Sequence, residues 1–569
     1  METIEKHKTT KMPQEEGIKH ATIHSQEIKG EEKEAAQTSF ADYSYYASGT
    51  KEKEEIDFSV CKTPVIHGEG LLLYYDKVKN YKKRECYHDL YDYIVNDYTG
   101  RVCILYGLRR TGKTTMLYQL LHDIDISKTV YIKVDESNTM GDLIKDINYL
   151  TKQGIQYFLI DEVTLLSDFI NSAASLSDIY CSMGYKIVLS GTDSLGFDFA
   201  RRDELYDRTV TIHTSYIPYK EFANLLYKSD IDDYIEYGGT LQKENMKIGE
   251  LRYKESEFTF LDDKGTRKYI DTAISQNIQR SLRNERFGSK FYFLKELYDN
   301  NELTNAINRI VESMNHDFVL SVIQELFVSH DLGSARQMLL HERDEEVQFA
   351  LSNINEKAVL DALKEIIKVR EASEAKVQVT QEAVDQIKSY LYALDLIKDV
   401  EIRYANGKIK KEPVFTQPGM RYSIAKALCH SLMQDEAFGS INEKSKEIIL
   451  NKILSDVKGR MLEEIVLLES TFAKKSTEIV FKYIDNITWA ECDMVKYNKR
   501  KDSFVAYEIK HAKKANVATQ AKHLNNKNFM LELSKKYGTL EKKVVLYRGH
   551  AQEIDGIKYL PVDYYLKNL

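Results

Sequence analysis

The chain has 569 residues and a mass of 66.0 kDa, which corresponds to about three or four domains of average size. Hydrophobic residues make up 43% and charged residues 30%, a globular composition that excludes wholesale disorder. No apolar run approaches the roughly 18 residues that a membrane-spanning helix needs, and the charged N-terminus lacks the apolar segment of a secretory signal. We therefore expect a cytoplasmic protein without membrane contact.

The net charge of −8 is unevenly distributed. The segment 459–569 carries 20 Lys and Arg against 14 Asp and Glu, so the acidic excess lies in the rest of the chain. A basic segment indicates a nucleic-acid partner, although a soluble, lysine-rich surface has the same composition. The six cysteines are far apart and form no CxxC pair, which favours reduced thiols and disfavours a zinc site.

Residues 1–60 are polar, with runs of Glu and Lys, and predict a disordered or loosely attached arm. Between 61 and 240, short β-branched and aromatic runs alternate with helix-length segments, which predicts βαβ units and a parallel sheet. The expected strands are 102–106, 129–134, 157–160, 186–190 and 210–214.

The rest of the chain divides into three further regions. Residues 241–380 have mostly helical periodicity. In 381–458 a helix, two strands and another helix follow one another, a pattern typical of a winged helix-turn-helix and equally of an α+β lid. The last region, 459–569, begins with a helix over 459–472. The strands expected after it are 478–484, 492–498, 504–510, 542–548 and 557–566.

A phosphate-binding motif lies between the first strand and the following helix. The residues from Gly107 to Thr114 fit GxxxxGK[ST], in which glycines let backbone N–H groups surround a phosphate beside a helix N-terminus. Lys113 would reach the β- and γ-phosphates, and the Thr114 hydroxyl would ligate Mg²⁺. Without the flanking strand and helix, the motif could be a chance glycine-rich turn.

Two carboxylates follow the strand 157–160. Asp161 at the end of a buried strand suits a magnesium ligand, and Glu162 is placed to polarise an attacking water. Three arginines, Arg201, Arg202 and Arg208, precede the last strand and could reach a neighbouring subunit's nucleotide, although ordinary surface ion pairs also explain them.

The stretches YGLRRTGKTTML, YFLIDEV and VLSGTDS, followed by ELYDRTVTIHTSYIPYKEF and YIEYGGTL, resemble archaeal and bacterial AAA-type ATPases. In that group a P-loop domain is joined to a winged helix and a C-terminal nuclease-like domain. The resemblance implies ATP and Mg²⁺ as cofactors, a homo-oligomer, and a catalytic arginine at Arg208. The nucleotide-binding residues would be Gly107, Arg110, Thr111, Gly112, Lys113, Thr114, Thr115 and Asp161.

A second acidic constellation lies in 459–569. Glu508 and Lys510 are two apart on a strand and so face the same side, and a hairpin could bring Asp493 next to Glu508. With Glu463 on the preceding helix, these carboxylates could bind Mg²⁺ while Lys510 orients water. The order resembles the PD-(D/E)xK nucleases, which often have a glutamine where Gln520 stands. The alternative is a degenerate nuclease fold that is retained for binding.

The sequence thus predicts an α/β protein with a P-loop parallel-sheet ATPase domain, a helical and winged-helix middle region, and a restriction-endonuclease-like C-terminal domain. The expected function is ATP hydrolysis whose nucleotide state gates Mg²⁺-dependent attack on nucleic acid. The main alternative is a nucleotide-driven switch or scaffold that binds a protein partner, with a catalytically silent C-terminal domain. A third possibility is a nucleic-acid-binding ATPase that remodels without cutting.

Overall fold

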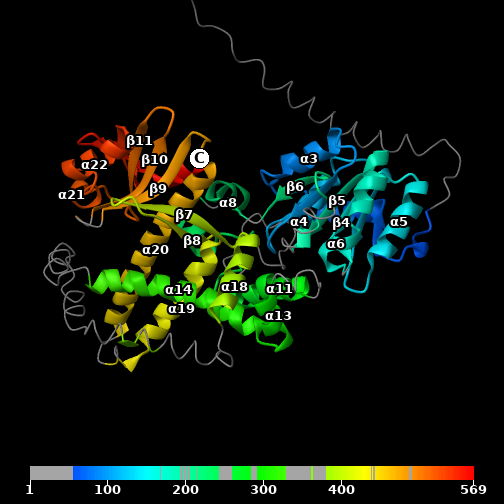
Figure 1. Ribbon diagram of the computed structural model, residues 1–569, viewed down its shortest axis with the longest axis horizontal. Helices are drawn as coiled ribbons and strands as arrows, with labels where there is room; N and C mark the ends of the chain where they lie inside the picture. The colour runs from blue at the N-terminus through cyan, green and yellow to red at the C-terminus, as the bar shows by residue number, and fades with distance from the viewer. Residues whose placement is uncertain are drawn as a thin grey trace, which may run out of the picture. The chain divides into compact units, whose positions relative to one another are not determined.

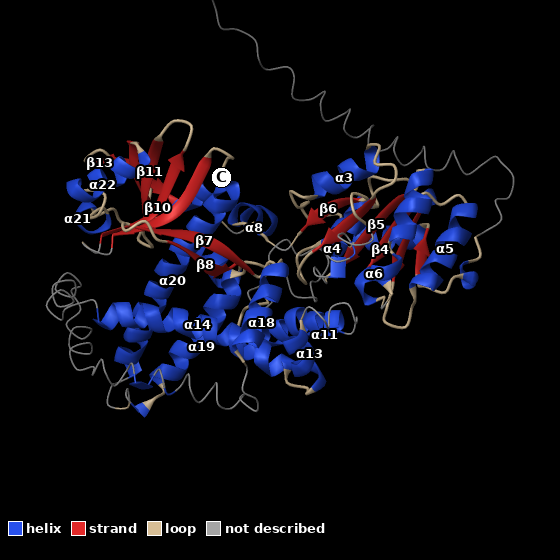
Figure 2. Ribbon diagram, in the orientation of Figure 1, coloured by secondary structure: helices blue, strands red, loops and turns tan. Residues whose placement is uncertain are grey.

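The computed structural model describes two β-sheets and the helices around them (Figures 1 and 2). The described residues are 56–166, 168–192, 196–197, 200, 205–214, 216–227, 229–241, 259–282, 291–328, 361–362, 365, 380–436, 439, 443–485, 488 and 490–569. The predicted arm therefore lies outside the described residues, except for its last positions. Residues Phe58–Leu569 form one unit.

The first sheet has the strand order β1-β3-β4-β5-β2-β6. Its strands are β1 (Val65–His67), β2 (Val102–Tyr106), β3 (Thr129–Lys133), β4 (Tyr157–Asp161), β5 (Lys186–Gly191) and β6 (Thr209–His213). All neighbouring pairs are parallel except β1 with β3, which is antiparallel. The five strands predicted in this region are confirmed, and β1 adds an edge that the sequence did not reveal.

Helices flank this sheet. Those before β5 are α2 (Glu69–Asp76), α3 (Tyr87–Val95), α4 (Lys113–Leu120), α5 (Met140–Lys152) and α6 (Phe169–Ser172), with the short helices η1 (Phe58–Val60), η2 (Ile126–Lys128), η3 (Val163–Leu165), η4 (Leu176–Tyr180) and η5 (Cys181–Met183). The helices packed on one face of the sheet include α4, which follows the loop after β2. Side chains from α2, α3 and α4 pack on alternate strand residues such as Leu105, Leu159 and Val188. This packing fixes the helix that begins at Lys113 against the strand that ends before Gly107.

The middle of the chain is helical, as the periodicity predicts. Its described helices are α8 (Tyr219–Leu226), α9 (Ile231–Tyr237), α10 (Asp263–Tyr269), η7 (Ile270–Ser275), α11 (Gln276–Leu282), α13 (Tyr292–Asp299) and α14 (Leu303–Val328). Residues 242–258, 283–290, 329–360 and most of 363–379 lie outside the described residues. In the part that is described, no helix is both long and apolar enough to cross a membrane.

The expected helix–strand–strand–helix order follows, as α18 (Gln381–Ala393), β7 (Ile397–Tyr404), β8 (Ile409–Phe415) and α19 (Pro418–Met433). The hairpin does not stand alone, because β7 also pairs in parallel with β9 (Glu478–Asp485), with Ile402 opposite Lys482. The two strands thereby become the end of the second sheet.

The second sheet has the order β13-β14-β12-β11-β10-β9-β7-β8. Its other elements are α20 (Glu443–Ala473), β10 (Ala490–Asn498), β11 (Ser503–Ile509), α21 (Val517–Gln520), α22 (Lys527–Tyr537), β12 (Thr539–Tyr547), β13 (Gln552–Ile554), β14 (Ile557–Pro561) and α23 (Val562–Lys567). Helix α22 packs on one face, and α20 contributes to the core on the other, together with α8 and α9.

Two expectations for this region need correction. The strand predicted over 557–566 ends at Pro561, because Val562–Lys567 is helical and packs Val562 and Leu566 into the core at a helical spacing of four. The expected boundary between 458 and 459 falls inside α20, which continues as one helix from Glu443 to Ala473.

Candidate nucleotide and carboxylate sites

The loop from Gly107 to Lys113 joins β2 to α4 at the edge of the first sheet where β4 and β5 also end. Gly107 and Gly112 have φ angles of 151° and 89°, which side chains disfavour, and Arg110 has φ 65°. Gly112 is the residue before the first turn of α4, in the left-handed conformation. The sequence therefore has glycine at two of these three loop positions with positive φ.

Lys113 is buried in this loop. Its Nζ donates to the carbonyl oxygens of Gly107 at 2.8 Å and Leu108 at 2.9 Å. Burial lowers the pKa of Lys113 to about 8, against the opposing charges of Glu162 and Asp161. Phosphate oxygens are stronger acceptors than these carbonyls, so this ammonium group is positioned to exchange them for a phosphate.

Asp161 ends β4, is 2% exposed and accepts hydrogen bonds from three hydroxyl groups. Thr114 Oγ1 donates at 2.9 Å and Tyr131 Oη at 2.8 Å, both to Oδ2, while Ser190 at the end of β5 donates to Oδ1. A threonine hydroxyl beside a carboxylate is the hard oxygen pair that Mg²⁺ uses next to phosphates, so these residues fit that ion.

Glu162 follows Asp161 with a left-handed backbone, φ 60°. Burial and the neighbouring Asp161 charge raise the pKa of Glu162, while Lys113 and Arg280 of α11 act in the opposite direction. A non-glycine residue in this conformation beside a buried carboxylate is a frequent feature of functional sites. The side chain is half-buried, which suits a group that must meet a water molecule.

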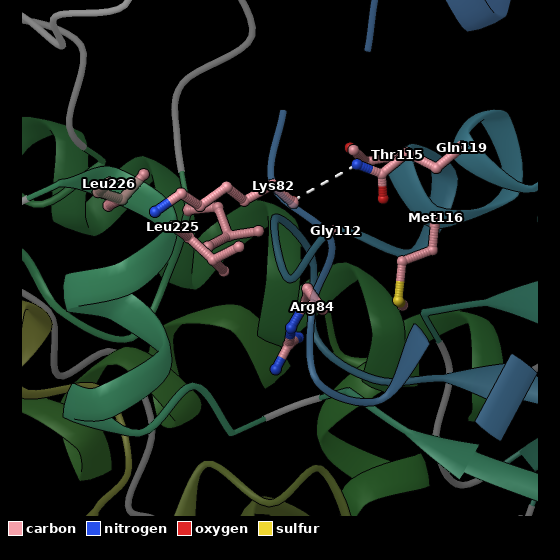
Figure 3. A pocket seen from close by; sticks show the side chains of 9 residues that line it. Lys82, Arg84, Gly112, Thr115, Met116, Gln119, Leu225 and Leu226 are labelled. Atoms are coloured by element: carbon pink, nitrogen blue, oxygen red, sulfur yellow. Dashed lines mark hydrogen bonds between the residues drawn. The ribbon is translucent and has the colours of Figure 1, made fainter. Parts of the chain in front are cut away.

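A pocket adjoins the loop on the side of α4 (Figure 3). The side chain of Gln119 crosses one of its edges and donates to the Lys82 carbonyl at 3.4 Å. Apolar side chains from α4, α8 and Leu241 form much of its wall. The lining residues are Lys82, Arg84, Gly112, Thr115, Met116, Gln119, Leu225, Leu226 and Leu241.

Of the three arginines predicted near the last strand, only Arg208 lies within the described residues. Its Nε forms an ion pair with Asp178 Oδ1 of the same chain at 3.2 Å, and both side chains are about half exposed. Arg201 and Arg202 fall outside the described part of the chain, as do Asp193 and Ser194 at the end of the stretch VLSGTDS.

The C-terminal constellation brings two carboxylates to one ammonium group. Lys510 Nζ lies 2.9 Å from Asp493 Oδ2 and 2.8 Å from Glu508 Oε2, and the Ile509 backbone N–H donates to Asp493 Oδ2 at 2.7 Å. Both carboxylates are 1% exposed. The antiparallel pairing of β10 with β11, in which Met494 lies opposite Tyr507, produces this proximity.

The charges of this cluster are strongly coupled. Burial would raise the pKa of Asp493, but the charges of Lys510 and Lys482 lower it to about 2. Burial and the Asp493 charge raise the pKa of Glu508 well above its ordinary value. The proximity of the two acids therefore disfavours ionisation of Glu508 and not of Asp493.

Glu463 of α20 lies at the border of this cluster. Burial and the Asp493 charge raise the pKa of Glu463, yet its Oε2 is held by Arg460 at 3.0 Å and by Lys482 at 3.5 Å. The adjacent Glu464 forms an ion pair with Arg421 of α19 instead. Adjacent positions on a helix point in different directions, so only Glu463 turns towards the sheet.

Two oxygens support a cation at this place. Asp493 Oδ1 and Glu508 Oε1 are buried and have no hydrogen-bond partner, and unpaired carboxylate oxygens attract a hard cation. In the described residues, however, no group of three or more His, Cys, Asp or Glu side chains is arranged to hold a metal ion. Gln520 bonds within its own loop, to the Asn516 N–H and the Lys514 carbonyl, both at 2.9 Å.

Sequence reasoning missed Tyr131, Ser190 and Arg84 as parts of the nucleotide site. Tyr131 and Ser190 lie in strands that were expected only to build the sheet, and their contacts with Asp161 arise from strand order. A possible signal was the polar end of the apolar run KIVLS. Arg84 stands in a run of charged residues, KKRE, that nothing distinguishes from a solvated surface.

Comparison with known proteins supports the first site. Residues 99–223 match a family model described as an AAA domain. The chain is similar to a solved Hsp104–ADP complex from S. cerevisiae, with 12% identity and a TM-score of 0.25, over 72% of this chain and 61% of that one. It is also similar to the Aeropyrum pernix ORC1 protein in complex with DNA, with 12% identity and a TM-score of 0.21, over 65% and 98% of the two chains.

The structural similarities are too weak to carry an argument about function, and no curated protein matches the chain. The family match coincides with the strand, glycine loop and helix that place Lys113 and Thr114 beside Asp161. Residues 99–223 are therefore an AAA-type P-loop domain.

Proposed function

We propose that the protein binds and hydrolyses ATP at the P-loop, with Mg²⁺. The observation that carries this proposal is the 2.9 Å contact between Thr114 Oγ1 and Asp161 Oδ2, with Lys113 buried in the same loop. Lys113 would neutralise the β- and γ-phosphates, Thr114 and Asp161 would hold the ion, and Glu162 would orient the attacking water. When bound, Mg²⁺ neutralises charge on the phosphates.

The remaining contacts of the nucleotide are assigned from the loop and its pocket. The backbone of Gly107, Arg110, Thr111, Gly112 and Thr115 would surround the phosphates. The pocket beside α4 would take the base, since Met116, Leu225 and Leu226 offer apolar contact. In a homo-oligomer, Arg208 would exchange its exposed partner Asp178 for the nucleotide of a neighbouring subunit.

The C-terminal sheet would be the second active site, controlled by the first. Asp493 and Glu508 would offer Mg²⁺ their unpartnered oxygens, and Glu463 would join them by leaving Arg460 and Lys482. Lys510 would orient water towards a nucleic-acid phosphate. This is supported by the unpartnered oxygens of Asp493 and Glu508 and by the basic composition of 459–569. In this proposal residues 381–458 form a winged-helix-like region that contacts nucleic acid, and the protein acts in the cytoplasm.

The first experiment measures nucleotide binding in Lys113→Ala. We expect affinity for ATP to fall about 100-fold, because a charge-assisted contact to two phosphates is lost. Lys128→Ala is the matched control, since Lys128 forms only an exposed pair with Asp125 at 3.6 Å. A Lys113→Ala protein with wild-type affinity would overturn the assignment of the pocket.

One observation favours a second candidate, a nucleotide-driven switch that binds a protein partner. Lys510 already bridges Asp493 and Glu508, and Glu463 is held by two cations. A cluster neutralised by its own side chains could be purely structural. Under this alternative, partner binding is unchanged in Asp493→Ala but is lost in Lys113→Ala, and no nucleic acid is cleaved.

A further inference from the structure

The buried guanidinium group of Arg84 connects the P-loop to α8. Nη1 donates to the carbonyl oxygens of Thr111 at 2.6 Å and Thr214 at 2.8 Å, and Nη2 donates to that of Tyr216 at 3.0 Å. Nε and Nη2 also bind the two carboxylate oxygens of Glu221, at 2.9 and 2.8 Å. All five N–H donors of the side chain are therefore used.

The bond to Thr111 fixes the orientation of a P-loop peptide. In a trans peptide the C=O and the following N–H point in opposite directions. Because Arg84 holds the Thr111 carbonyl, the Gly112 N–H must point the other way. Thr111 Oγ1 adds a bond to the Leu108 carbonyl at 2.7 Å. Arg84 is thus a positioning residue for the loop.

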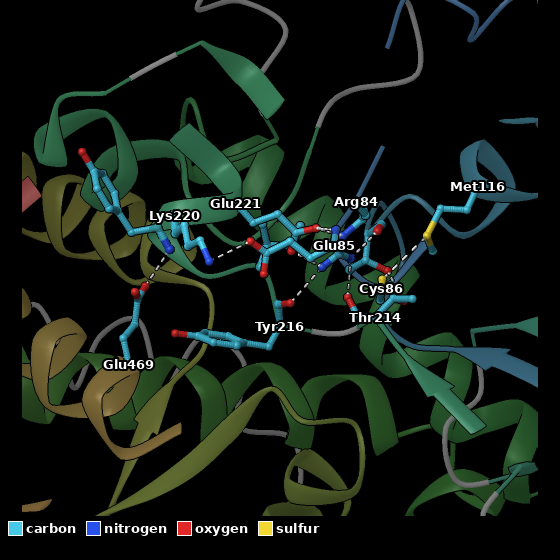
Figure 4. Close-up of polar contacts among 12 residues, drawn as sticks. Arg84, Glu85, Cys86, Met116, Thr214, Tyr216, Lys220, Glu221 and Glu469 are labelled. Carbon is cyan, nitrogen blue, oxygen red and sulfur yellow. Dashed lines mark hydrogen bonds and ion pairs between the residues drawn. The ribbon is translucent and has the colours of Figure 1, made fainter. Parts of the chain in front are cut away.

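Glu221 lies in the first turn of α8, and this turn also contacts the C-terminal half of the chain. The backbone N–H of Tyr219, two residues earlier, donates to Glu469 Oε1 of α20 at 2.7 Å, and both groups are buried. Helix α8 also shares its hydrophobic core with α20. The first turn of α8 therefore contacts both Arg84, which binds the P-loop, and α20, which carries Glu463. Figure 4 shows Arg84 facing Glu221, with Glu469 at the far end of the same network.

We propose that the Arg84–Glu221 pair transmits the nucleotide state of the P-loop to α20 through the first turn of α8. Filling the loop with phosphate fixes the Thr111–Gly112 peptide, which strengthens the bonds of Arg84 to that peptide and to Glu221. The Tyr219–Glu469 bond carries this restraint to α20. The proposal rests on the proposed function, because it needs nucleotide at the P-loop.

The test follows amide hydrogen exchange over residues 463–473 with and without saturating ADP and Mg²⁺. In the wild type we expect nucleotide to slow exchange there about tenfold, as for one added charge-assisted contact. In Glu221→Gln, which keeps an acceptor for the Glu85 N–H, we expect this slowing to fall below about twofold while ADP still binds.

Lys220→Gln is the matched control, because Lys220 lies on the same turn but forms only an exposed pair with Glu85 at 3.1 Å. It should respond to ADP as the wild type does. Arg84→Lys, which keeps the charge but loses the planar fork, should lose most of the response and bind ADP about tenfold more weakly.

The outcomes separate this inference from the proposed function. If the wild type and Lys113→Ala bind nucleotide equally poorly in calorimetry, the proposed function fails. If the wild type binds ADP but residues 463–473 do not respond, or if Glu221→Gln responds fully, only the transmission through Arg84 and Glu221 is overturned.

Discussion

At the P-loop site the buried carboxylate of Asp161 accepts hydrogen bonds from three neutral hydroxyl groups, whereas at the C-terminal site Asp493 and Glu508 share one ammonium group. Neutral donors orient a carboxylate and leave its charge available to a cation. A lysine that bridges two acids instead offsets part of their charge. In the proposed mechanism the first site offers its carboxylate directly to an ion, whereas at the second site an ion would share two carboxylates with Lys510.

The largest expected difference between the two sites concerns Glu162. In Glu162→Gln we expect ATP hydrolysis to fall by about 100-fold or more, because the amide cannot polarise the attacking water. Nucleotide affinity should stay within about threefold of the wild type, since Lys113 and Thr114 are intact. Phosphate release and calorimetric binding measure the two effects. The exposed Glu69→Gln serves as control, and unchanged phosphate release in Glu162→Gln would remove Glu162 from the mechanism.

A buried carboxylate on α20, the helix that also carries Glu463, should respond to pH. Burial raises the pKa of Glu469 to about 7, although the Tyr219 N–H lowers it, and in the unfolded chain a glutamate titrates near 4.3. The folded protein therefore holds this proton more tightly, and its stability falls as pH rises from about 4 to 7. Glu469→Gln keeps the acceptor and cannot ionise.

We accordingly expect Glu469→Gln to exceed the wild type in free energy of unfolding by about 2–4 kcal/mol at pH 8, and by little at pH 4.5. Denaturant unfolding at the two pH values measures the difference. Glu532→Gln, which replaces an exposed partner of Lys535, should change neither value. An equal difference at both pH values would show that Glu469 does not titrate as described.

The smallest expected effect sharpens the account of the first site. Tyr131→Phe removes one of the three hydroxyl donors to Asp161. The free energy of the lost hydrogen bond is about 1 kcal/mol. The Mg²⁺ concentration for half-maximal ATP hydrolysis should rise several-fold. Tyr93→Phe is the matched control, because its buried hydroxyl bonds the Arg101 and Ile187 carbonyls instead. An unchanged Mg²⁺ requirement in Tyr131→Phe would mean that Asp161 needs no such restraint.

The two sites also differ in how much of their structure can be predicted from the sequence. The P-loop is contiguous, and its strand and helix follow from short-range periodicity, so the elements from Val102 to Leu120 were predicted closely. The C-terminal strands were predicted with similar success, except that the short strand β13 was missed and the helix Val562–Lys567 was taken for a strand. An apolar, aromatic run of that length has no periodicity that separates the two structures.

What the sequence could not provide are the contacts between distant segments. The partners of Arg84 lie between 27 and 137 residues away, and those of Tyr131 depend on the order of the strands in the sheet. Likewise, the joining of β7 to β9 cannot be read from either strand, because parallel pairing leaves no local turn signal.

The most direct test of the coupled account is cleavage of nucleic acid in different nucleotide states. The wild type is incubated with single- and double-stranded DNA and RNA in Mg²⁺ or Mn²⁺, with ATP, with ADP and without nucleotide, beside Asp493→Asn and the exposed turn variant Asp502→Asn. The account predicts cleavage whose rate depends on the nucleotide, which is lost in Asp493→Asn and kept in Asp502→Asn. A wild type that hydrolyses ATP but cleaves nothing under any of these conditions would contradict it.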